Sequence, residues 1–107
     1  MKSYTDLEQS KKLAEILPVE SADMYYEDDI SVEFGHGWHT QHIPCWSLVA
    51  LLDLCPTING KQPILTKGKL TSLWYCYYED EIDTQTYDNP IDACYEMITR
   101  LNELNLL

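Results

Sequence analysis

The spacing of apolar residues predicts three helices. The first begins near Thr5, where a threonine followed three residues later by a glutamate forms a capping-box pattern, and it ends before Pro18. The second covers about 44–55 and contains only two polar residues, so we expect it to be buried on most sides as the central core element. The third covers about 90–104 and follows Asn89, a residue type favoured at helix N-caps.

Alternating apolar and polar residues, bounded by turn signals, predict short strands between these helices. The strands are expected at 24–26, 30–34, 62–66, 70–78 and 84–87. The last three form an antiparallel β-meander, because a Lys-Gly pair and an acidic run separate them as turns. The pattern therefore predicts an α+β fold, with about three helices packed on a small antiparallel β-meander. Residues 1–107 are expected to form a single globular domain, because a chain of this length fits one domain and not two.

The strand expected at 70–78 has apolar or aromatic side chains on both faces. Because Trp and Cys suit an interior better than two hydroxyl-bearing rings, we expect Trp74 and Cys76 to point toward the helices. Tyr75 and Tyr77 then lie on the less protected face. Tyrosine is favoured at protein interfaces, so these two are candidate interface residues for a protein partner or a second copy in a homodimer. The alternative is a central strand in which only the tyrosine hydroxyl groups reach water.

The charge of the chain narrows the range of partners. Asp and Glu number 18 and Lys and Arg number 7, which gives a net charge of −11. Such a surface repels phosphate groups, so we expect no direct binding of nucleic acid and no binding of a membrane. The sequence shows no segment that resembles a signal peptide or a bilayer-spanning helix. We therefore expect a cytoplasmic protein whose four cysteines are reduced.

Three histidines and a cysteine recur at every third position, as His36, His39, His42 and Cys45. Imidazole nitrogens and a thiolate are good zinc ligands, so these residues are the candidate metal site, although their spacing is not that of a familiar zinc finger. The alternative is a polar loop followed by a buried Cys45. A nucleophilic Cys45 with His42 as its base is a further hypothesis, but no third group that would orient the pair is visible. We assign no catalytic residues and expect no cofactor.

Three segments of the chain resemble a known group of proteins. Their sequences are LPVESADM at 17–24, PCWSLVALL at 44–52 and DACYEMI at 92–98. They are similar to small acidic proteins of unknown function that are encoded in phages, prophages and mobile elements of gut anaerobic bacteria. The resemblance covers most of the chain and implies no activity and no site residues. It favours an accessory role that acts on a host or phage protein.

Three functional hypotheses follow from the sequence. The first is a non-catalytic accessory module of phage or mobile-element origin that binds a protein, and it rests on the aromatic strand and on the resemblance. The second is an acidic nucleic-acid mimic that inhibits a DNA-binding protein, and it rests on the net charge of −11. The third is a small zinc protein that uses the segment from His36 to Cys45. We favour the first.

Overall fold

The described part of the chain folds into three α-helices and six short strands. The structure is a computed structural model that describes residues 2–28, 31–35 and 42–107. The helices are α1 (Leu7–Ala14), the 3₁₀ helix η1 (Val19–Ser21), α2 (Leu48–Leu54) and α3 (Pro90–Glu103). The strands are β1 (Met24–Tyr26), β2 (Val32–Phe34), β3 (Ile43–Cys45), β4 (Ile64–Lys67), β5 (Trp74–Tyr78) and β6 (Ile82–Asp83). The predicted α+β class is confirmed.

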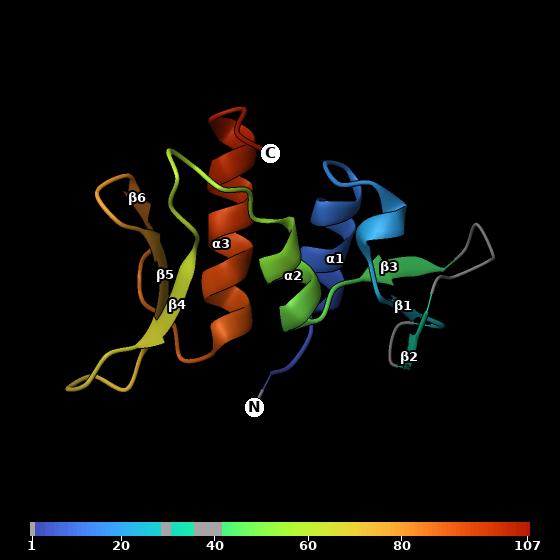
Figure 1. Ribbon diagram of the computed structural model, residues 1–107. Coiled ribbons are helices and arrows are strands. Elements are labelled where there is room, and N and C mark those ends of the chain that lie inside the picture. Colours follow the sequence, from blue (N-terminus) through green and yellow to red (C-terminus); the bar gives the residue numbers. More distant parts are fainter. Residues whose placement is uncertain (1, 29–30, 36–41) are drawn as a thin grey trace.

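The strands form two antiparallel sheets instead of one meander. The first sheet has the order β2-β1-β3, and the second has the order β4-β5-β6. Figure 1 shows the two sheets at opposite ends of the molecule with the helices between them. The expected meander corresponds to the second sheet. No helix in the described part of the chain is both long and apolar enough to cross a membrane.

The segment before α2 is a strand, which corrects the helix predicted from residue 44. Pro44 lies opposite Tyr25 in the pairing of β1 with β3. Because β3 is an edge strand of its sheet, it can contain a proline, although the same residue would also suit the first turn of a helix. The helix begins after Ser47, whose side chain accepts a hydrogen bond from the Ala50 backbone N–H at 3.3 Å. The carboxylate of Asp23 holds Ser47 in place by accepting from its backbone N–H at 2.9 Å.

The core is centred on α3, so the prediction that α2 would be its centre is wrong. Helix α2 buries Ala50 and Leu51, but its Val49 side chain is 75% exposed. Helix α3 instead carries a full apolar stripe on one side. Its fully buried apolar side chains are Ile91, Ala93, Cys94, Met97, Ile98 and Leu101. An apolar composition alone does not show which helix the other elements will surround.

The start of α3 follows the predicted pattern closely. Asn89 caps the helix by accepting a hydrogen bond from the Asp92 backbone N–H at 2.9 Å, and Pro90 occupies the first helical turn. The Asp92 carboxylate in turn accepts hydrogen bonds from Lys2 Nζ and Gln9 Nε2, each at 2.8 Å. This cap therefore also ties the N-terminal segment and α1 to α3.

Strand β5 begins four residues later than the predicted 70–78, at Trp74. Residues 68–73 form a turn that is closed by a hydrogen bond from the Gly68 N–H to the Leu73 carbonyl at 2.8 Å, and Ser72 adopts a left-handed φ of 57°. Leu70, which the alternating pattern placed on the inner face, is 99% exposed in this turn. The return strand also differs, because β6 covers Ile82–Asp83 and not 84–87.

Candidate functional site

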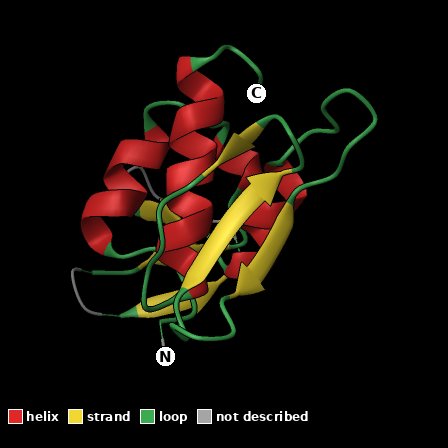
Figure 2. Ribbon diagram, turned by 90° about the vertical axis from the view of Figure 1, so that its left-hand side faces the viewer, coloured by secondary structure: helices red, strands yellow, loops and turns green. Residues whose placement is uncertain are grey.

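Strand β5 has one face in the core and one face outside it. Cys76 and Tyr78 are 0% and 1% exposed and belong to the same buried cluster as the apolar side of α3. The alternate residues Tyr75 and Tyr77 are half-buried and lie outside that cluster. Figure 2 shows the β4-β5-β6 sheet in front of the helices, with its other face open toward the viewer. Among the described elements, the helices thus cover only one face of this sheet.

The register of the sheet defines which residues share the open face. Ile64 lies opposite Tyr77, and Thr66 lies opposite Tyr75 in the pairing of β4 with β5. Asp83 lies opposite Tyr77 in the pairing of β5 with β6. Directly opposed residues point to the same side of a sheet. We call this surface, formed by Ile64, Thr66, Tyr75, Tyr77 and Asp83, the outer face.

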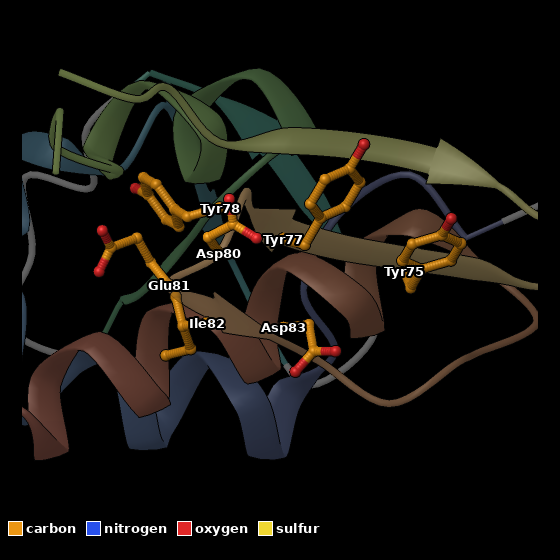
Figure 3. A pocket seen from close by; sticks show the side chains of 7 residues that line it. All are labelled: Tyr75, Tyr77, Tyr78, Asp80, Glu81, Ile82 and Asp83. Carbon is orange, nitrogen blue, oxygen red and sulfur yellow. The ribbon is translucent and has the colours of Figure 1, made fainter. Parts of the chain in front are cut away.

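The two tyrosines of the outer face form a stacked aromatic pair. Their ring centroids are 5.6 Å apart and the ring planes differ by 25°, which is a stacked arrangement. Tyr75 and Tyr77 rise from β5 in the same direction in Figure 3. They line an open pocket of about 370 Å³. The other lining residues are Tyr78, Asp80, Glu81, Ile82 and Asp83.

Carboxylates surround this aromatic surface. Among the described residues that line the pocket, three are acidic and none is basic. Glu81 is partly compensated, because its Oε1 atom lies 3.8 Å from Lys61 Nζ and accepts a hydrogen bond from Asn59 Nδ2 at 2.9 Å. Within the described part of the chain, the carboxylates of Asp80 and Asp83 have no hydrogen-bond or ion-pair partner. The pocket therefore combines aromatic faces with uncompensated negative charge.

Contacts from the core side hold the pocket walls in position. The Tyr78 hydroxyl donates a hydrogen bond to the Pro56 carbonyl at 2.7 Å, which anchors the end of β5. The Thr84 hydroxyl accepts a hydrogen bond from the Cys76 N–H at 3.0 Å, and Arg100 of α3 donates to the Asp83 carbonyl. These contacts fix the backbone of β5 and the start of the segment after β6, from which the rings and carboxylates of the pocket extend.

The structure describes only two of the four residues of the predicted metal site, His42 and Cys45. His36 and His39 lie outside the described residues. His42 stacks on Tyr25 with ring centroids 4.7 Å apart, and Cys45 is fully buried at the end of β3. Among the described residues, no group of three or more His, Cys, Asp or Glu side chains is placed to hold a metal ion. The zinc hypothesis thus stays a prediction that depends on His36 and His39.

Cys45 has the environment of a packed core residue. Its Sγ atom donates a hydrogen bond to the Thr5 carbonyl at 3.4 Å. Burial raises the pKa of the Cys45 thiol, and the hydrogen bonds from Thr5 and its neighbours only partly offset this. The residue also ends a strand and does not begin a helix, so no helix N-terminus lowers its pKa. The packing interpretation of Cys45 therefore fits the structure better than the nucleophile.

The residues that sequence reasoning missed are Asp80, Glu81, Ile82 and Asp83. The acidic run after β5 was interpreted as a solvated turn, separate from Tyr75 and Tyr77. Their position follows from the register of the hairpin, which residue types alone do not give. The tight turn from β5 into β6 returns Asp83 to the position beside Tyr77. An acidic turn directly after an aromatic strand is therefore a pattern that predicts one combined surface.

Comparisons of this chain with protein-family models, with curated proteins and with solved structures find no match. The resemblance of the segments at 17–24, 44–52 and 92–98 to phage and mobile-element proteins accordingly stays a prediction. The outer face, with its stacked tyrosines and the acidic pocket beside them, is the surface from which a function can be proposed.

Proposed function

We propose that this chain is a non-catalytic protein-binding module, an accessory protein of phage or mobile-element origin. It binds its partner through the outer face of the β4-β5-β6 sheet. The observation that carries the proposal is the stacked pair Tyr75 and Tyr77, which lines a pocket on a sheet face that the described helices leave open. The resemblance of three sequence segments to phage and mobile-element proteins supports the proposed origin.

The make-up of the outer face supports a protein partner. Binding energy at protein interfaces is concentrated in a few central aromatic or arginine residues, surrounded by a polar rim. Here Tyr75 and Tyr77 form the aromatic centre, the acidic turn forms the rim, and Ile64 adds an apolar side chain that is 40% exposed. A rigid ring pair loses little conformational freedom on binding, which favours affinity.

We also propose that the protein works in the cytoplasm. All four cysteines are free and buried. Burial raises the pKa of Cys55 to about 12, which keeps this thiol protonated and unreactive at neutral pH. Free, buried thiols suit a reducing compartment, where structural disulfides are rare.

The experiment compares the wild-type protein with the double variant Tyr75→Ser, Tyr77→Ser. Tagged forms of both are used to capture proteins from a bacterial host lysate, and the captured proteins are quantified by mass spectrometry. The matched control, Glu8→Gln with Glu15→Gln, changes exposed residues of α1 and leaves the outer face intact. We expect partner proteins to be retained by the wild type and the control and lost with the tyrosine variant. Equal capture by all three folded proteins would show that the outer face is not the binding surface.

A further inference from the structure

We propose that the outer-face pocket binds an arginine side chain on a basic segment of the partner protein, an inference that rests on the proposed function above. The guanidinium group stacks on an outward face of the stacked pair of Tyr75 and Tyr77. Its N–H groups donate hydrogen bonds to the carboxylates of Asp80 and Asp83. The arginine thus fills a pocket that combines two binding features, an aromatic surface and negative charge.

The aromatic surface suits a planar cation. The two rings are stacked at 5.6 Å and differ in plane by only 25°, so each ring covers one face of the other and keeps its outward π-face for a ligand. A cation over a tyrosine face is attracted by the negative charge of the ring centre. This preference already appears within the chain, since Lys67 Nζ lies 5.8 Å from the ring centroid of Trp74 at the other end of the same strand.

The rim supplies the complementary charge. The carboxylates of Asp80 and Asp83 form no ion pair or hydrogen bond with another described side chain, while Arg100 donates to the backbone carbonyl of Asp83, and both residues are exposed. The Lys61 ammonium group pairs with the Glu81 carboxylate at 3.8 Å. It also donates a hydrogen bond to the Glu79 backbone carbonyl at 2.7 Å. An incoming cation therefore meets Asp80 and Asp83 first. Neither has to be separated from an internal partner before it binds.

The charge of the whole chain favours a basic partner over an apolar one. The sequence contains no Lys or Arg between Lys69 and Arg100, and this interval includes the whole of β5, the acidic turn and β6. With a net charge of −11, the protein attracts basic segments at long range and repels a second copy of itself. Arginine is favoured over lysine because its planar group stacks on rings and binds carboxylates through several donors at once.

The test is an NMR titration of ¹⁵N-labelled protein with a capped hexapeptide in which arginine and glycine alternate. Two control peptides carry lysine or uncharged citrulline in place of arginine. We expect amide shifts concentrated in residues 75–83, with the arginine peptide binding more tightly than the lysine peptide and the citrulline peptide failing to bind. Raising the salt concentration should weaken the binding of the arginine peptide.

Four double variants, one of them a charge control, assign the contacts. Asp80→Asn with Asp83→Asn should weaken the arginine peptide by about fivefold or more, the loss typical of two exposed charge pairs. The control Glu8→Gln with Glu15→Gln changes the net charge equally and should leave the affinity unchanged. Tyr75→Ser with Tyr77→Ser should weaken binding roughly tenfold. Tyr75→Phe with Tyr77→Phe keeps the rings and should retain binding, which separates stacking from hydroxyl contacts.

Several outcomes would overturn the inference. They are an absence of shifts in residues 75–83 at millimolar peptide, equal weakening by the rim and control variants, and a dimer in light scattering that the Tyr75→Ser, Tyr77→Ser change abolishes. The two proposals fail in different ways. If the peptide does not bind but capture from the lysate still depends on Tyr75 and Tyr77, the arginine inference is wrong and the proposed function stands. If that capture does not depend on the tyrosines, the proposed function itself is wrong.

Discussion

Tyr77 and Tyr78 are neighbours in β5 but lie on opposite faces of the sheet, and replacing each by serine tests this assignment. Tyr78 is 1% exposed and packs in the core with α3. Tyr77 is half-buried on the outer face and stacks on Tyr75. The two substitutions remove the same atoms from adjacent positions of one strand. Any difference in stability therefore comes from which face each ring occupies.

The structure allows the two losses to be estimated. Deleting a buried aromatic ring costs about 3–5 kcal/mol, and the lost hydrogen bond from Tyr78 to the Pro56 carbonyl adds about 1 kcal/mol. Deleting the outer ring of Tyr77 removes the stack with Tyr75, about 0.5–1.5 kcal/mol, together with a limited area of apolar contact. We therefore expect Tyr78→Ser to destabilise the fold by at least about 2 kcal/mol more than Tyr77→Ser.

Urea and thermal unfolding followed by circular dichroism measure this difference. For a chain of this size, 1 kcal/mol corresponds to roughly 4–8 °C in Tm, so the two variants should be well separated. Tyr78→Phe serves as an intermediate case that loses only the hydroxyl and should cost about 1 kcal/mol. Equal losses for Tyr77→Ser and Tyr78→Ser would refute the two-faced strand, and with it the outer face as a site.

Three further predictions concern the core and the helix cap. Leu51→Ala removes a fully buried side chain of α2 and should cost about 2–5 kcal/mol in urea unfolding, whereas Val49→Ala, at a 75% exposed position, should change stability little. Although burial raises the pKa of Asp92, hydrogen bonds from Lys2, Asn89 and Gln9 lower it below the ordinary value of 3.8. The Asp92 carboxylate thus stabilises the fold above pH 3.8, and this contribution is lost as the pH falls through the folded-state pKa. Asp92→Asn should therefore lower the free energy of unfolding near neutral pH and leave it equal to that of the wild type in strong acid. Cys55, whose pKa burial raises to about 12, should react with iodoacetamide at neutral pH only after unfolding, and rapid labelling of the native protein would contradict its placement in the core.

The parts of the fold that could be predicted from the sequence are those governed by local chemistry. Helix α3 is bounded by an N-cap asparagine and a proline in its first turn, so its start at Pro90 follows from short-range rules. The alternation of Trp74, Cys76 and Tyr78 with Tyr75 and Tyr77 likewise needs only the two-residue period of a strand. This period placed the two tyrosines on the less protected face of β5, as the structure has them.

The parts that could not be predicted depend on distant contacts. Pro44 suits the first turn of a helix equally well, and only its pairing with β1 makes it part of a strand. Leu70 continues the apolar alternation of β5, but the turn closed between Gly68 and Leu73 removes it from the sheet. The acidic rim of the pocket depends on the register between β5 and β6, which a list of residue types does not contain.

The most direct test of the proposed binding face is photo-crosslinking from single positions in cells that express the protein. Tyr77 is replaced by p-benzoylphenylalanine, which keeps an aromatic ring on the outer face, and a control protein carries the same group at the exposed Glu8 of α1. After irradiation, adducts are identified by mass spectrometry. We expect an adduct with a partner protein at position 77 and none at position 8. In this adduct, the crosslinked site of the partner should lie beside a basic segment. Adducts that form at position 8 but not at position 77 would show that the partner binds elsewhere.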